Sequence, residues 1–209
     1  MSGGDWASGE AGRDELRIEG EVRWFAASDK ARRGFCPNCG AFLFWEAHGS
    51  GQIAFALGAV DGATGLSGLH HIFVPEGAPE GGPLRDACLC GAVTVEHPGG
   101  AGDVTACHCI QCRKVSGHLP RFLDDPGRVS RVTGEVARFT SPGGAVRSFC
   151  PVCGTKLAFD EPTGLRYLHA GLFDALAARK ADVHIFAAWK GDYYDIPEGV
   201  PAYPEAGPD

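Results

Sequence analysis

The chain has 209 residues, of which 44% are hydrophobic and 22% charged, and its formal net charge is −7. This composition is typical of a soluble globular protein with one large or two small domains. The acidic balance without clustered Lys and Arg argues against a nucleic-acid partner, and the apolar runs are too short for a membrane span.

The predicted elements, in chain order, are mostly short strands. The 31 glycines and 14 prolines indicate many tight turns and few long helices. From alternating or β-compatible apolar sequence we expect strands at residues 91–96, 132–139, 165–171 and 183–189. One short helix is expected at residues 110–116, where N–H groups at its start would favour the thiolate form of nearby cysteines.

An internal repeat relates two parts of the chain. Residues 17–45 align with residues 131–159 at a constant offset of 114, and 13 of the 29 positions are identical. Chance would give roughly two identities, so we interpret the segments as copies of one module. The similarity continues to His71 and His184, and we expect both to be structural histidines.

The first copy begins partway through the module, because nothing before it corresponds to residues 88–112. The predicted organisation is therefore a polar tail (1–15), a half-module repeat (16–77) and a full module (84–205), with a Gly- and Pro-rich linker between the last two.

The nine cysteines all lie in tight clusters. These are Cys36-x-x-Cys39, Cys88-x-Cys90, Cys107-x-Cys109-x-x-Cys112 and Cys150-x-x-Cys153. A Cys-x-Cys pair and a Cys-x-x-Cys turn together supply the four thiolates that close a structural zinc site. The three-cysteine run closes only three corners, so a metal held there would keep one position for water or substrate.

The odd number of cysteines argues against a disulfide framework. The start of the chain shows no basic region followed by an apolar one, so no secretory signal is visible. We therefore expect a cytoplasmic protein whose cysteines stay reduced and available to metal.

Four motifs in order resemble the glutathione-dependent formaldehyde-activating enzyme family, which also includes centromere protein V-like members. They are C-x-C-G-x-V (88–93), C-H-C-x-x-C-R-K (107–114), F-C-x-x-C-G (149–154) and H-I-F (184–186). The resemblance covers residues 84–204, whereas the first copy matches only the second half of the family pattern.

This resemblance implies a mainly β, β-tent-like fold stapled by two zinc ions per chain. One zinc would be structural, and the other would have an open position. The structural set is Cys88, Cys90, Cys150 and Cys153, and the open-site set is Cys107, Cys109 and Cys112. The spacing of the cysteines favours the same partition.

Three thiolates around Zn²⁺ leave a net charge of about −1, which weakens its Lewis acidity and suits it to binding a thiolate. The resemblance implies a carbon–sulfur lyase, with a small-molecule thiol such as glutathione, or an adduct of it, as its partner. The alternative is a non-catalytic, zinc-stapled binding or scaffold module in which the second zinc has a fourth protein ligand.

Four residues near the three-cysteine run are candidates for further roles. Arg113 and Lys114 could offset its negative charge or bind a substrate carboxylate, or they could be solvated helix residues. His118 could act as an acid–base group or simply stabilise a loop. His108 lies between two ligands, so we expect its side chain to point away from the metal.

Cys36 and Cys39 lack a Cys-x-Cys partner in their own copy. Two chains could share a zinc ion across a homodimer interface. The pair could instead compete with Cys150 and Cys153 for Cys88 and Cys90, or it could be metal-free in a half-module packed on the full one. We favour the last arrangement, because the apolar strand residues of the half-module need burial.

Overall fold

The computed structural model describes residues 4–70, 72 and 82–207, and it is mainly β as the sequence predicts. Among these residues one α-helix and several short 3₁₀ helices connect the strands. No helix in the described part of the chain is long and apolar enough to cross a membrane.

The strands, in chain order, are β1 (Gly4–Trp6), β2 (Ser8–Gly12), β3 (Arg23–Ala26), β4 (Ala31–Phe35), β5 (Phe42–Ala47), β6 (Gln52–Ala56), β7 (Leu84–Ala87), β8 (Thr94–His97), β9 (Val104–Cys107), β10 (His118–Asp124), β11 (Arg131–Thr133), β12 (Ala137–Thr140), β13 (Val146–Phe149), β14 (Lys156–Asp160), β15 (Arg166–His169) and β16 (Val183–Ile185). The helices are η1 (Leu57–Ala59), α1 (Ile110–Ser116), η2 (Pro126–Arg128), η3 (Ala170–Leu172), η4 (Asp174–Leu176) and η5 (Ala187–Trp189).

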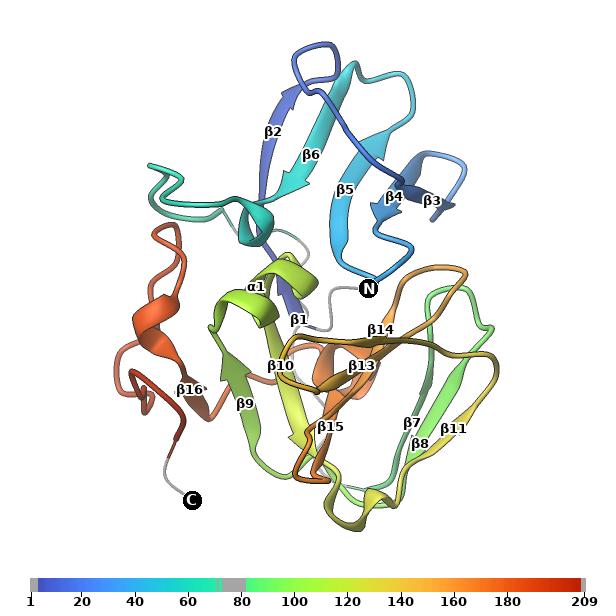
Figure 1. Cartoon of the computed structure of the whole chain (residues 1–209), viewed down its shortest axis with the longest axis vertical. Helices are drawn as coiled ribbons and strands as arrows, with labels where there is room; N and C mark the ends of the chain where they lie inside the picture. Colours follow the sequence, from blue (N-terminus) through green and yellow to red (C-terminus); the bar gives the residue numbers. More distant parts are fainter. Residues whose placement is uncertain (1–3, 71, 73–81, 208–209) are drawn as a thin grey trace.

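These strands form three sheets. The upper sheet in Figure 1 has the order β2-β6-β5-β4-β3 and contains the N-terminal copy of the repeat. Below it lies the large sheet, β12-β13-β14-β15-β10-β9-β16, with β1 paired to β10, and a small sheet, β11-β8-β7. Helix α1 lies between the upper sheet and the large one (Figure 1).

Strands β3 to β6 pair in the same order and register as strands β12 to β15. Arg23 pairs with Phe35, and Ala137 pairs with Phe149, at the same offset of 114. In each copy the register of the next strand pair shifts just before that phenylalanine, between Gly34 and Phe35 and at the matching place in the second copy. The aligned segments therefore share a backbone arrangement as well as residues.

The two aligned segments pack against each other through a reciprocal contact. A Cβ added at Gly40 would lie 2.6 Å from Cγ of Phe149, and a Cβ added at Gly154 would lie 2.7 Å from Cγ of Phe35. Both phenylalanine side chains are fully buried. Each ring thus lies on the glycine of the opposite Cys-x-x-Cys turn, where a side chain would not fit.

Residues 4–12, expected as a polar tail, form strands instead. β1 extends the large sheet through pairing with β10, and β2 extends the upper sheet through pairing with β6. The physical reason is the anchor between the two strands: Ala7 is buried, and the Trp6 ring stacks on Phe42 at 4.7 Å between centroids.

The predicted helix at 110–116 is confirmed with the same bounds. The strand expected at 132–139 divides into β11 and β12, because Gly134 turns the chain with a φ of +112°. The strand expected at 183–189 ends at Ile185, because Phe186 adopts a left-handed conformation and starts a 3₁₀ turn. His71 lies outside the described residues, so its expected role stays a prediction.

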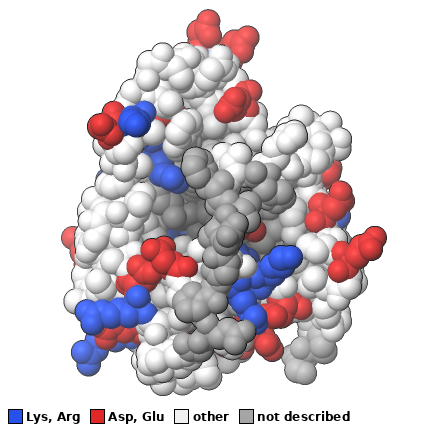
Figure 2. All heavy atoms as spheres, turned by 180° about the vertical axis from the view of Figure 1, so that it is seen from behind, with Lys and Arg blue, Asp and Glu red and all other residues white. Residues whose placement is uncertain are grey.

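The main hydrophobic core lies where the small sheet covers the large one. The β7–β8 hairpin contributes Val93 and Val95, and the large sheet contributes Leu157 and Leu168, all with no exposed surface. On the molecular surface in Figure 2, basic and acidic side chains are interspersed.

Candidate metal centre

The first cysteine pair lies in the turn between β7 and β8. The Cys88 N–H donates to the Val93 carbonyl (2.7 Å), and the Gly91 N–H donates to the Cys88 carbonyl (2.8 Å). Gly91 has a φ of +76°, which lets the chain turn back at this point. The Val93 N–H also lies 3.2 Å from the Cys88 sulfur. This tight turn points the sulfur atoms of Cys88 and Cys90 to the same side.

The second pair lies in the Cys-x-x-Cys turn between β13 and β14. The Cys150 N–H donates to the Thr155 carbonyl, and the Gly154 N–H donates to the Cys150 carbonyl, both at 2.9 Å. The Thr155 hydroxyl lies 3.2 Å from the Cys153 sulfur and accepts from the Leu89 N–H. Thr155 therefore ties this turn to the turn that carries the first pair.

The two turns bring four sulfur atoms within 4.8 Å of one another; they belong to Cys88, Cys90, Cys150 and Cys153. The Cys90 sulfur lies 3.5 Å from that of Cys88 and 3.7 Å from that of Cys150. A tetrahedral zinc with bonds of about 2.3 Å requires sulfur–sulfur separations of about 3.8 Å. The group thus has the donor atoms and the size of a closed four-thiolate zinc site.

A second group of sulfur atoms forms where β9 ends and α1 begins. Cys107, Cys109 and Cys112 bring their sulfur atoms within 4.8 Å of one another. Cys109 caps the helix, since its sulfur accepts from the Cys112 N–H at 3.4 Å. Hydrogen bonds from Cys107 and Cys112 lower the pKa of Cys109 to about 2. In the described part of the chain no fourth Cys, His, Asp or Glu joins this triad.

Arg147, on β13, is a neighbour of the triad that the sequence analysis does not identify. Its guanidinium lies 3.7 Å from the Cys112 sulfur and donates to the Ser141 hydroxyl at 3.0 Å. Although Arg147 is only 3% exposed, its charge faces a sulfur cluster rather than a carboxylate. The repeat has an arginine at the matching position, Arg33, but the first copy has no cysteine triad, so the sequence carries no signal for this contact.

Aromatic side chains surround the triad. The residues packed on Cys107, Cys112 and their neighbour Phe122 include Phe159, Tyr167, Ile185 and Phe186, all from the large sheet or the segment after β16. Phe186 has a φ of +55°, a conformation that costs about 1–3 kcal/mol outside glycine. The hydrogen bond from the Phe186 N–H to the Glu205 carbonyl helps to hold this conformation, and the side chain packs beside the thiols. In the sequence the residue stands out only as part of H-I-F.

His108 points away from the triad, as expected for a residue between two ligands. Its Nε2 lies 2.8 Å from Nδ1 of His184, and the two buried rings are stacked with centroids 5.1 Å apart. Burial lowers the pKa of His108 to about 3, so this histidine is neutral at physiological pH. The structural role predicted for His184 is confirmed by this hydrogen bond.

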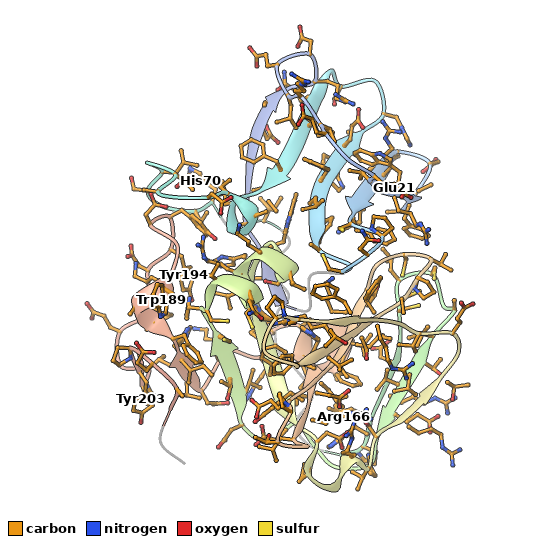
Figure 3. The ribbon with its side chains drawn as sticks, in the orientation of Figure 1. Glu21, His70, Arg166, Trp189, Tyr194 and Tyr203 are labelled. Atoms are coloured by element: carbon orange, nitrogen blue, oxygen red, sulfur yellow. The ribbon has the colours of Figure 1, made fainter. Side chains whose placement is uncertain are left out.

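The remaining candidates lie on α1 or, for His118, at the start of β10. Lys114 pairs with Asp61 of the N-terminal copy at 2.5 Å, and this hydrogen bond lowers the pKa of the aspartate. The Arg113 carbonyl accepts from the Gly117 N–H at the end of the helix. His118 is buried, with its ring 4.9 Å from that of Tyr194, which lies beside α1 in Figure 3. Acid–base or carboxylate-binding roles for Arg113 and His118 stay predictions.

Cys36 and Cys39 join neither group of sulfur atoms, and both are partly exposed.

A family model described as glutathione-dependent formaldehyde-activating enzyme matches residues 83–189, just over half of the chain. The match includes the seven cysteines of the two groups and excludes Cys36 and Cys39. A search of curated proteins found no match.

Proposed function

The chain belongs to the glutathione-dependent formaldehyde-activating enzyme family, and on this basis we propose that it is a zinc-dependent enzyme acting on thiol adducts. The supporting observation is the triad Cys107, Cys109 and Cys112, which offers three sulfur donors and no fourth ligand among the described residues. In this proposal the four-thiolate group holds a structural zinc, so that each chain carries two zinc ions.

The reaction class is the addition of a small-molecule thiol to a carbonyl compound, and its reverse. The sulfur attacks the carbonyl carbon, a carbon–sulfur bond forms, the C=O π bond breaks, and the carbonyl oxygen takes up the proton that the thiol loses. A zinc ion held by three thiolates would favour the thiolate form of the incoming sulfur at neutral pH. Glutathione and formaldehyde are the substrates that the family description suggests.

The residues around the triad would support this chemistry through their charge, their packing and their hydrogen bonds. Arg147 places a positive charge beside Cys112, where it offsets the negative charge of the thiolates. The aromatic residues packed on the triad exclude water from one side of the site, which strengthens electrostatic interactions there. The neutral pair His108 and His184 fixes the backbone between two of the thiols.

Exchange NMR with glutathione and formaldehyde tests the proposal, because it measures interconversion of the free thiol and its hydroxymethyl adduct above the spontaneous rate. The full chain should accelerate exchange, and Cys112→Ser should remove the acceleration while the protein stays folded. Gln111→Ala, at an exposed neighbouring position, is the matched control and should keep the full rate. An unchanged rate in Cys112→Ser would contradict the mechanism.

The same experiment separates the enzyme from the scaffold alternative. If the wild-type chain binds two zinc ions but exchange stays at the spontaneous rate with several thiols and aldehydes, the triad zinc has a structural role. Zinc content by elemental analysis is therefore measured on the same samples.

A further inference from the structure

The N-terminal copy lacks one element that the full module has, namely the β7–β8 hairpin with its two cysteines. In the full module, β8 pairs antiparallel with β11 (Arg131–Thr133). The equivalent segment of the first copy, residues 17–19, forms no strand in the described structure and is partly or fully exposed. A stretch of backbone that is paired in one copy thus has no strand partner among the described residues in the other.

The Cys36-x-x-Cys39 turn already has the backbone of its metal-site counterpart. The Cys36 N–H donates to the Ala41 carbonyl (2.9 Å), and the Gly40 N–H donates to the Cys36 carbonyl (2.8 Å). Cys150 and Gly154 make the same two bonds, and the φ angles of the glycines are +70° and +75°. Two thiols are therefore presented as in the four-thiolate group, and no third Cys, His, Asp or Glu of the described chain joins them.

A groove of about 470 Å³ connects this turn with the unpaired segment. Its lining includes Cys36, Ile18, Val22, Leu43 and Phe44. In the full module the counterparts of Ile18, Val22 and Leu43 are Val132, Val136 and Leu157, which belong to the hydrophobic core or pack against it. With the hairpin present they line a smaller pocket, of about 220 Å³. Figure 3 shows Glu21, another lining residue, on the opposite side of the upper sheet from His70.

Two equivalent glycines differ in whether a described residue fills the hairpin position. A Cβ added at Gly134 would lie 2.2 Å from the carbonyl oxygen of Ala92, so the hairpin is in contact with this glycine. A Cβ added at Gly20 would meet no atom of the described residues within 4 Å. No residue in the described part of the chain thus takes the place in the N-terminal copy that residue 92 has in the full module.

We propose that the N-terminal copy binds a β-hairpin of a partner polypeptide that carries a Cys-x-Cys pair, and that this pair and Cys36–Cys39 together hold a zinc ion. One strand of the hairpin would pair with residues 17–19 and place its apolar side chains in the groove, a case of β-strand addition. Its two thiolates would complete a four-thiolate site. The full module shows the same arrangement within one chain.

A buried lysine lies beside the turn, and burial lowers the pKa of its amine to about 7. The Lys156 side chain is 1% exposed, donates to the Gly40 carbonyl and lies 5.3 Å from the centre of the Phe149 ring. No carboxylate pairs with it among the described residues. A zinc ion with four thiolates carries a net charge of about −2, so a nearby ammonium would stabilise it.

A synthetic peptide with the sequence of residues 83–98 is the probe, because it contains the hairpin that fills the equivalent place. The zinc-loaded full chain is titrated with the labelled peptide and one further equivalent of Zn²⁺, and anisotropy and bound zinc are measured. We expect zinc-dependent binding and one additional zinc per chain. Binding should be lost with a peptide carrying Cys88→Ser and Cys90→Ser, and with the chain carrying Cys36→Ser and Cys39→Ser.

A second variant, Ile18→Asp, tests the groove without touching a thiol and should weaken binding while circular dichroism stays unchanged. Equal binding to the Cys36→Ser, Cys39→Ser chain would show that the peptide occupies another site and would overturn the proposal. So would a zinc content that does not rise. A third zinc taken up without peptide, together with dimer formation in light scattering, would show that a second copy supplies the thiolates and would overturn the hairpin partner.

Discussion

Replacing Gly40 by alanine probes the packing between the two Cys-x-x-Cys turns. Gly40 has a φ of +70°, and an L side chain in this left-handed conformation costs about 1–2 kcal/mol. The new Cβ would also lie 2.6 Å from Cγ of Phe149 and 2.7 Å from Nζ of Lys156. Since the Phe149 ring is fully buried, overpacking should add about 1–3 kcal/mol. We therefore expect the free energy of unfolding to fall by about 2–5 kcal/mol.

Gly49→Ala is the matched control. Gly49 has a φ of +74°, but a Cβ added there meets none of the described atoms within 4 Å. This variant should lose only the conformational part, about 1–2 kcal/mol. The difference between the two variants isolates the steric contact with the opposite turn.

Equilibrium unfolding in urea at a fixed zinc concentration measures both losses, and thermal unfolding provides a second reading. For a chain of this length, each kcal/mol corresponds to about 2–4 °C in Tm. Equal losses in Gly40→Ala and Gly49→Ala would refute the reciprocal packing of Phe149 on Gly40. If the packing is as described, Gly40→Ala should cost less in a Phe149→Leu background, because the smaller side chain leaves room for the added methyl group.

Three further predictions concern the metal centres. Arg147→Met should lower kcat/KM for thiol-adduct exchange about 10- to 100-fold, because a charge-assisted hydrogen bond to sulfur is worth about 1.5–3 kcal/mol; zinc content should be unchanged, and full activity would contradict the role of the guanidinium. Cys150→Ser should remove about one zinc per chain and lower Tm, because zinc binding is coupled to folding, whereas Cys36→Ser should keep both ions; elemental analysis and calorimetry check this. Lys114→Ala should leave the exchange rate unchanged, because its ammonium pairs with the exposed Asp61; a strong rise in KM would instead indicate a substrate carboxylate.

The sequence predicts which sulfur atoms meet, because the relevant information is local. A Cys-x-Cys pair and a Cys-x-x-Cys turn each fix two thiols within a few residues, and the structure brings the same seven thiols into the two expected groups. The helix at 110–116 follows from similar short-range signals. Zinc binding by these groups stays a prediction.

Features that depend on contacts between residues far apart in the sequence could not be predicted from local patterns. Residues 4–12 have no clear strand pattern, yet they pair with β10 and β6, which are distant in the sequence, and Trp6 stacks on Phe42. Arg147 lies 35 residues from Cys112 in the sequence, and the residues next to Arg147 give no indication that its side chain contacts a sulfur atom. The left-handed conformation of Phe186 likewise follows from its tertiary surroundings, since its amide donates to Glu205 of the C-terminal segment.

Helix α1 contributes to the cysteine triad and is in contact with the N-terminal copy, so the geometry of the triad depends on that copy. The helix has only seven residues, too few to be stable alone, and its first turn contains two of the three thiols. At its other end the Gly58 N–H donates to the Gly117 carbonyl, and Trp6 packs against Gly117. A fragment trimmed to the family-matched residues 83–189 would lose both supports, so we expect it to unfold at a lower temperature than the full chain.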